Sequence, residues 1–296
     1  MAQCLSLESI NLSHLKALKT VGSGFITACP SLTSAYLSNL ECLQGVGDYF
    51  MAKCPSLKFV ELSHLKALKT VGNEFLCNCS NLTSADLRGL ERLERVGDKF
   101  MAQSSSLESI DLSHLKALKT VGSGFIGACI KLRSADLRGL ENLESVGNYF
   151  MAKCTSLESI DLSNQNALKT LGNDFLFGCS ILKSADLRGL ENLERMGDYF
   201  IAKCTSLESI DLSHLKALTT VGHRFLFACS NIKSANFSGL ENLDTLGDYF
   251  MAECTSLESI DLSHLKALKT VGNEFLSFSP ARDSSSVKGW LALLLT

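Results

Sequence analysis

Residues 107–129 read Leu-Glu-Ser-Ile-Asp-Leu-Ser-His-Leu-Lys-Ala-Leu-Lys-Thr-Val-Gly-Ser-Gly-Phe-Ile-Gly-Ala-Cys, and this pattern recurs every 25 residues along the chain. Phenylalanine occupies position 25 and every 25th position after it, through Phe275. Glycine does the same from Gly22, and leucine from Leu18. The eleven copies contain no insertion or deletion, and a fixed period of this length is typical of stacked-repeat architectures. We call each copy a rung.

The first part of a rung predicts a short β-strand. Ile110 and Leu112 are two residues apart, so they point to one side of a strand, and Asp111 points to the other side. We therefore expect a strand near 107–112 in this rung, with an extended stretch further along.

The second part of a rung predicts a helical turn. The residue after each column glycine is Ser, Asp, Asn or His, and most of these are residues that cap helix N-termini. Residues 124–129 follow this position in the rung quoted above and have the length of about one helical turn. We expect a capped single helical turn there.

Stacking is required because one rung cannot bury its own apolar face. We therefore predict an α/β fold: a right-handed solenoid of eleven 25-residue rungs, with a parallel sheet on the concave face and short helical turns elsewhere. Parallel strands about 4.8 Å apart give the rungs a span of roughly 50 Å. The solenoid is expected to cover residues 1–276. Residues 277–296 leave the repeat, and we expect 287–296 to form a short helix that caps the last rung.

The rung pattern Cys-x-x-Leu-x-Ser-Ile-Asp-Leu-x-x-Leu-x-x-Leu-x-x-Val-Gly-x-x-Phe resembles the BspA-type leucine-rich repeats of bacteria and protists. The segment Val-Gly-x-x-Phe-x-x-x-Cys carries most of this resemblance, which covers about residues 1–276. The near-identical copies look more like protist arrays than bacterial ones. The resemblance implies a surface protein, an adhesin or an interaction scaffold, and it brings no catalytic motif and no cofactor.

Composition narrows the classes of partner. The net charge is -3, with 28 basic and 31 acidic residues, so no basic excess favours nucleic acid. No apolar run reaches the roughly 18 residues of a membrane span. Residues 1–6 lack the features of a signal peptide, so a cytoplasmic location is the default expectation. If the chain is a fragment without its signal sequence, the cell surface becomes the expectation.

Cysteine and histidine columns are interpreted as structural. Ten of the twelve cysteines share one column, in which Ser104 and Ser279 fill the gaps. Small buried thiols with weak backbone hydrogen bonds account for this column, and the spacing lacks a zinc motif. Cys42 lies outside it, in a column of varied residues, and is expected to be more accessible. The histidines of alternate rungs, such as His114, are expected at the turn after the strand.

The outward strand positions are the candidate binding site. They combine a stripe of carboxylates with guanidinium groups and serine hydroxyls: Asp86, Arg88, Asp111, Asp136, Arg138, Asp161, Asp186, Arg188 and Asp211. Three interpretations stay open. The face is a self-neutralising solvated surface, a docking surface for a basic or mixed-charge partner segment, or a set of cation-bridged carboxylates, for which calcium would need more oxygens than a flat sheet offers.

Together these features predict a non-catalytic scaffold that binds a protein partner through the concave sheet face. The alternative is a surface antigen or adhesin of a protist or bacterium. We expect no enzyme activity, no cofactor and no metal. Four tyrosines that follow the cap position, Tyr49, Tyr149, Tyr199 and Tyr249, are expected on the convex side, either as stem packing or as a row of binding residues. The uncapped N-terminal end favours end-to-end self-association.

Overall fold

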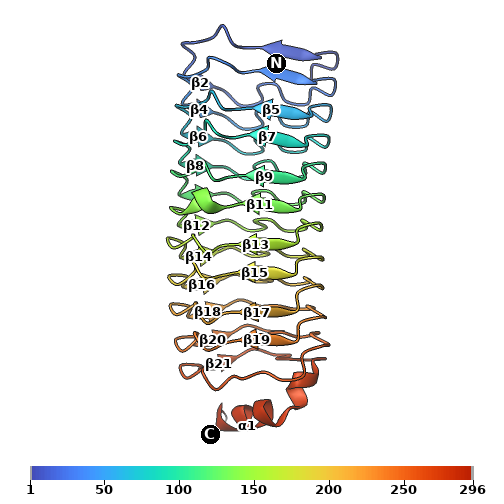
Figure 1. The fold of residues 1–296 in the computed structure, drawn as a ribbon, viewed down its shortest axis with the longest axis vertical. Helices are drawn as coiled ribbons and strands as arrows, with labels where there is room; N and C mark the ends of the chain where they lie inside the picture. The colour runs from blue at the N-terminus through green and yellow to red at the C-terminus, as the bar shows by residue number, and fades with distance from the viewer. Residues whose placement is uncertain (1, 295–296) are drawn as a thin grey trace. The chain divides into compact units, whose positions relative to one another are not determined.

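The computed structural model describes residues 2–294, with side chains through residue 292. The chain forms two compact units, Met1–Cys154 and Thr155–Thr296. Within each unit the strands of successive rungs form two columns (Figure 1), although the last rung, at 259–261, has no strand in the first column.

Three-residue strands form the first column, which we call the strand face. In Met1–Cys154 they are β1 (Ser9–Asn11), β3 (Ser34–Tyr36), β5 (Phe59–Glu61), β7 (Ser84–Asp86), β9 (Ser109–Asp111) and β11 (Ser134–Asp136). In Thr155–Thr296 they are β13 (Ser159–Asp161), β15 (Ser184–Asp186), β17 (Ser209–Asp211) and β19 (Ser234–Asn236). They pair in parallel two by two, with an offset of one rung, as in Ile110 beside Ala135. The pairs are β1 with β3, β5 with β7, β9 with β11, β13 with β15, and β17 with β19. The predicted strand near 107–112 is confirmed as β9.

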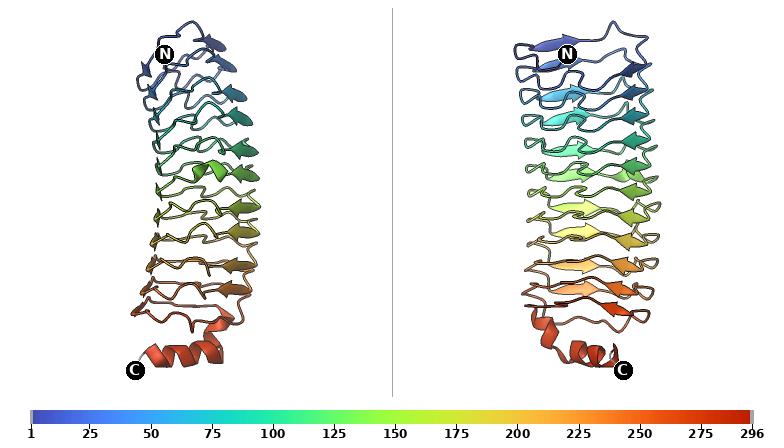
Figure 2. Two further views of the ribbon diagram at one scale, coloured as in Figure 1. Left: turned by 60° about the vertical axis from the view of Figure 1, so that its left-hand side comes forward. Right: turned by 180° about the vertical axis from the view of Figure 1, so that it is seen from behind.

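Two-residue strands form the second column, which we call the second sheet. In Met1–Cys154 they are β2 (Thr20–Val21), β4 (Gly45–Val46), β6 (Thr70–Val71), β8 (Arg95–Val96), β10 (Thr120–Val121) and β12 (Ser145–Val146). In Thr155–Thr296 they are β14 (Thr170–Leu171), β16 (Arg195–Met196), β18 (Thr220–Val221), β20 (Thr245–Leu246) and β21 (Thr270–Val271). The sequence predicted only an extended stretch here, but these strands also pair in parallel, as Val121 does with Val96. Figure 2 shows both columns from two further sides. The predicted parallel-sheet solenoid of 25-residue rungs is confirmed.

Stacked columns of identical side chains form the core. The phenylalanine rings lie nearly parallel from rung to rung, with Phe75 and Phe100 at 5.3 Å between ring centroids. Such a pair contributes about 0.5–1.5 kcal/mol beyond the burial of its area. Leucine columns surround the rings and are almost fully buried, as at Leu107 and Leu118. The core therefore repeats with the sequence.

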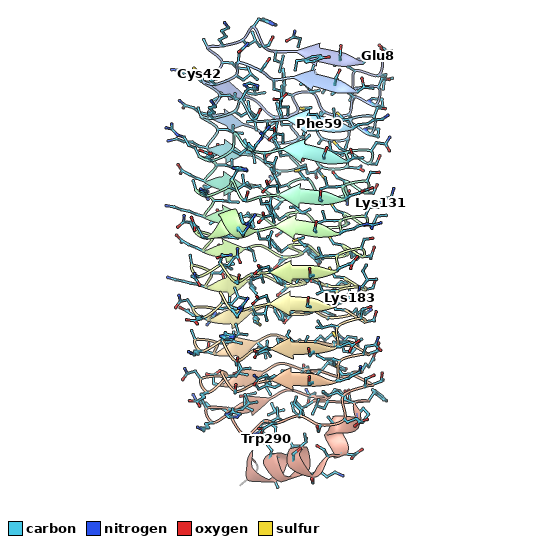
Figure 3. All side chains as sticks on the ribbon, viewed as in Figure 1. Glu8, Cys42, Phe59, Lys131, Lys183 and Trp290 are labelled. Carbon is cyan, nitrogen blue, oxygen red and sulfur yellow. The ribbon has the colours of Figure 1, made fainter. Side chains whose placement is uncertain are left out.

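The cysteine column is buried, apart from the half-buried Cys4, and its thiols are hydrogen-bonded to the backbone, as predicted. The Cys79 thiol donates to the carbonyl oxygen of Met51 at 3.2 Å, and Cys229 donates to Ile201 at 3.1 Å. Ser104 makes the equivalent bond to Leu76, which explains why serine can replace cysteine in this column. Cys42 is exposed, as expected, and Figure 3 shows it at the outer edge of its rung.

The segments expected as capped helical turns have a different backbone. Lys99, Met101 and Gln103 alternate in the left-handed region, with φ near 56°, 53° and 60°. Their N–H groups bond to neighbouring rungs instead of to their own turn: Lys99 to the Ser123 carbonyl and Met101 to the Phe75 carbonyl. A helical turn would direct these donors within the rung. Left-handed residues cost roughly 1–2 kcal/mol each, and the inter-rung bonds offset this cost.

Helical structure in the described residues is confined to three short segments. They are η1 (Arg138–Leu140), η2 (Pro280–Asp283) and α1 (Ser285–Leu294). In the last of these, Trp290, which is labelled in Figure 3, stacks on Phe275 of the final rung with ring centroids 5.7 Å apart. Val287 of the same helix is completely buried. The helix expected in the tail is therefore present through residue 294, and residues 295–296 lie outside the described part.

Candidate functional site

The candidate residues on the strand face form the same clasp on alternate rungs. Asp86 ends β7, and its Oδ1 accepts a hydrogen bond from the backbone N–H of Arg88 at 3.1 Å. This turn, closed by an aspartate side chain, brings the Arg88 side chain back over the carboxylate. Arg88 Nε then lies 2.9 Å from Asp86 Oδ1, and Nη2 lies 2.6 Å from Oδ2. The guanidinium is therefore held in one orientation.

The clasp recurs 50 and 100 residues further along. Arg138 Nη2 lies 2.5 Å from Asp136 Oδ2 in the first unit, and Arg188 Nη2 lies at the same distance from Asp186 Oδ2 in the second. In all three pairs the arginine side chain is at least 66% exposed, whereas the aspartate is at most 28% exposed. Each of these rungs therefore presents a guanidinium above its carboxylate.

The hydrogen bonds from arginine lower the pKa of Asp86, Asp136 and Asp186 below its usual value. Partial burial opposes this effect without cancelling it. These three carboxylates are therefore expected to stay ionised to a lower pH than an ordinary aspartate.

The remaining candidate residues lie on the intervening rungs and have no arginine two positions on. Asp111, Asp161 and Asp211 each accept a backbone N–H from the serine two residues later, at 2.8–3.0 Å. Asp111 also lies 3.8 Å from Nε2 of His114, which follows the strand as expected. The Asp111 side chain is 58% exposed, so these rungs present carboxylates.

Strand register brings the two kinds of rung together. Asp111 pairs with Asp136 between β9 and β11, and Asp161 pairs with Asp186 between β13 and β15. In the first unit Asp86 ends β7, which lies beside β9 but is not hydrogen-bonded to it. In the second unit Asp211 ends β17, which likewise lies beside β15 without pairing with it. We treat residues 86–138 as one set of neighbouring rungs and residues 161–211 as another. Along each set, an exposed guanidinium alternates with an exposed carboxylate. The sequence predicted the stripe but not the clasp. The signal that could have indicated the clasp is the motif Asp-x-Arg, with the aspartate at the end of a strand.

A second cluster of polar and aromatic groups lies on the turn segments and was not predicted. The Arg224 guanidinium lies between Tyr199 and Tyr249, 5.1 and 4.9 Å from their ring centroids. Phe177 and Phe227 each meet a tyrosine edge-to-face, Tyr199 and Tyr249 respectively. Two of the four tyrosines thus pack against phenylalanine. The available signal was the pair of phenylalanines in a column that otherwise holds small residues.

Among residues 2–294, no three His, Cys, Asp or Glu side chains are grouped so that they could hold a metal ion. Within the same part of the chain, no helix combines the length and the apolar character needed to cross a membrane.

Comparisons with known proteins agree with this geometry. A family model described as BspA type leucine rich repeat region (6 copies) matches residues 1–133, 69–190 and 186–283. A leucine-rich repeat protein from Bacteroides ovatus has a similar structure, with a TM-score of 0.56 and 17% identity over 90% of this chain and 84% of that one. A leucine rich cell surface protein from Faecalibacterium prausnitzii is similar with a TM-score of 0.53 and 16% identity, over 92% and 79% of the two chains. A sequence comparison with curated proteins found no match.

Proposed function

Because the chain belongs to the BspA-type leucine-rich repeat family, we propose that it is a non-catalytic scaffold whose strand face binds a protein partner. The observation that carries this proposal is the alternation of clasped guanidinium groups with exposed carboxylates along β7, β9 and β11, and again along β13, β15 and β17. A clasped arginine loses little conformational freedom on binding, which lowers the entropic cost of association.

The chemistry of the face favours a partner segment of mixed charge. Carboxylates of the partner would meet the guanidinium of Arg88 or Arg188, and its lysine or arginine side chains would meet Asp111 or Asp211. Complementary charges of this kind contribute more to specificity and association rate than to affinity. We therefore expect binding that weakens as the salt concentration rises.

Selection from a random peptide library tests this proposal. Peptides are selected on the wild-type protein and then measured on the combined variant Arg88→Ser, Arg138→Ser and Arg188→Ser. Serine occupies the same column on alternate rungs, as at Ser113, so the backbone tolerates it. Loss of hydrogen bonds to charged groups, at about 1.5–3 kcal/mol each, should weaken binding on the order of tenfold or more.

The matched control removes arginines from the other sheet. Arg95→Thr combined with Arg195→Thr gives the residue found at Thr70 and Thr120 of the second sheet, and it should leave the selected peptides bound. Peptides that bind the strand-face variant as tightly as the wild type would contradict the proposal.

A surface antigen or adhesin is the second candidate function. It is favoured by one similar structure, the Faecalibacterium protein described as a cell surface protein. Antibody raised against the folded chain distinguishes the two candidates. Staining of intact source cells supports the surface role, and staining only after permeabilisation supports an internal scaffold.

A further inference from the structure

An open pocket of about 340 Å³ lies on the turn segments of Met1–Cys154. Its lining includes Gly124, Gly127, Ala128, Tyr149 and Lys153. The volume falls within the range of about 300–1,000 Å³ that is typical of ligand sites. None of the lining residues belongs to the strand face, so the pocket is a separate feature.

The rung pair 50 residues further along shows what fills the equivalent place. There Phe177 takes the position of Gly127, Tyr199 that of Tyr149, and Lys203 that of Lys153. The Phe177 ring meets the Tyr199 ring edge-to-face, with centroids 5.7 Å apart and planes at 89°. The Lys203 ammonium lies 5.6 Å from the centroid of the Phe177 ring. Tyrosine and lysine therefore hold an aromatic ring between them.

Two backbone hydrogen bonds are the same in both places. Gly127 N–H donates to the Gly124 carbonyl at 3.1 Å, and Phe177 N–H donates to the Asp174 carbonyl at 3.1 Å. The next residue bonds to the following rung in both cases: Ala128 to Ala152 at 2.7 Å, and Gly178 to Ala202 at 2.8 Å. In these two bonds the pocket matches the Phe177 site, and it lacks the ring that occupies that site.

The tyrosine of the pocket is more exposed than its counterpart. Tyr149 is 52% exposed. Tyr199 is less exposed, because it packs against Phe177 and Arg224. Glycine at both 124 and 127 removes the side chains that would cover this area. Near the N-terminus Gly24 also precedes a tyrosine, Tyr49, but there Thr27 takes the place of Gly127.

We propose that the Gly127 pocket takes up the ring of a phenylalanine or tyrosine side chain from a protein partner. Tyr149 supplies the edge-to-face contact and Lys153 supplies the cation over the ring, as Tyr199 and Lys203 do for Phe177. Ala102 and Ala128 provide an apolar lining that leaves room for the ring. The site lies apart from the clasps on the strand face, so either site can fail without the other.

Ligand-observed saturation-transfer NMR with N-acetyl-L-phenylalaninamide tests the proposal. The wild type should saturate the ring protons of this probe more strongly than the methyl protons of N-acetyl-L-leucinamide. Gly127→Phe should fill the pocket from within and reduce the ring signal to the leucine background. Phe177 occupies the same column, but a Cβ at Gly127 would lie 3.2 Å from the Tyr149 carbonyl oxygen, which must shift slightly. Thermal unfolding verifies that the variant is folded.

Two further variants keep the proposal testable if Gly127→Phe does not fold. Phe177→Gly should open a second site and raise the ring signal, and Lys153→Met should lower it. The strand-face variant Arg88→Ser should leave the signal unchanged. An undiminished ring signal in folded Gly127→Phe, or an unchanged one in both Phe177→Gly and Lys153→Met, would overturn the proposal.

Discussion

The carboxylate of Asp98 fills the space in which a Cβ of Gly122 would lie. Its Oδ1 accepts a hydrogen bond from the backbone N–H of Ser123 at 2.7 Å, one rung further along. Asp48 and Asp198 make the same contact to their next rungs. The residues that were expected to cap helices, such as Asp98, therefore link adjacent rungs instead. Glycine is needed at position 122 because the preceding rung leaves no room for a Cβ. The φ of Gly122 lies outside the left-handed region, so backbone conformation is not what requires glycine here.

Gly122→Val should lower the free energy of unfolding by more than about 1 kcal/mol, because overpacking against backbone costs about 1–3 kcal/mol. Urea denaturation measures the effect. Gly22→Val is the matched control, since a Cβ at Gly22 has no atom within 4 Å. Equal midpoints for the Gly122 variant and the wild type would contradict the prediction, because they would show that the atoms of Gly97 and Asp98 move aside at little cost in stability.

The fold was predictable from sequence wherever one side chain repeats in a column. The alternation at Ile110 and Asp111 defined the strand, and the Phe75 and Phe100 positions defined the stacked core. The turn at Lys99 and Met101 was not predictable by the same reasoning. Its left-handed residues are stabilised by hydrogen bonds to adjacent rungs, which local rules of helix capping do not include.

The site was predictable only as a stripe of charge. The alternation of column residues placed Asp86 and Arg88 on one face, and the structure agrees. That Arg88 would fold back onto Asp86 depends on the turn at the end of β7. The Gly127 pocket exists because residue 127 has no side chain. The comparison with Phe177, whose ring occupies the equivalent place, is what reveals it.

Thiol labelling should separate the cysteines by burial. Ten of the twelve are buried, and burial raises the pKa of Cys54 to about 11 and that of Cys79 to about 12. Since the thiolate is the reactive form, these residues should react slowly with Ellman's reagent near neutral pH. Cys42 should react fast, and Cys42→Ser should remove the fast phase. All twelve should react in denaturant; rapid labelling of most thiols in folded protein would contradict the buried column.

Alkaline pH should destabilise the protein through the same thiols. The folded-state pKa of Cys79 is raised from 9.0 to about 12, mainly by burial, so its contribution to stability is fully present below pH 9. That contribution is lost as the pH rises from 9 to about 12, because the unfolded chain releases the proton first. Cys79→Ser should lose less stability over this window than the wild type, in urea denaturation at a series of pH values. Parallel pH profiles for the two proteins would argue against the thiol as the cause.

The Asp86 clasp should be visible in its titration. Arg88 lowers the pKa of Asp86, so the carboxylate should remain ionised below the pH at which an ordinary aspartate becomes protonated. Its contribution to stability is present above the unfolded-state pKa of 3.8 and is lost as the pH falls through the lower folded value. Arg88→Ser should return the pKa toward 3.8, as measured by carboxyl-detected NMR. A pKa that is the same in wild type and variant would mean that the clasp does not persist in solution.

The tail should stabilise the end of the solenoid on which it packs. The final rung has no following rung over Phe275, and Trp290 stacks on that ring. The backbone N–H of Ala281 also donates to the carbonyl of Leu257 at 2.8 Å, which ties η2 to the last rung. Solenoid ends need such caps, since they otherwise expose the apolar core. We therefore propose that 277–296 acts as the cap.

Trp290→Ala should lower the free energy of unfolding on the order of 1–2 kcal/mol, because a half-buried indole and one stacked pair are lost. Deletion of 287–296 should have a larger effect and should also promote association through the bared end, which sedimentation velocity detects. Gly289→Ala provides the opposite control: a Cβ there meets nothing within 4 Å, so alanine should strengthen α1 by about 0.5–1 kcal/mol. If the truncated chain is as stable and as monomeric as the full chain, the helix lies on the last rung without protecting it.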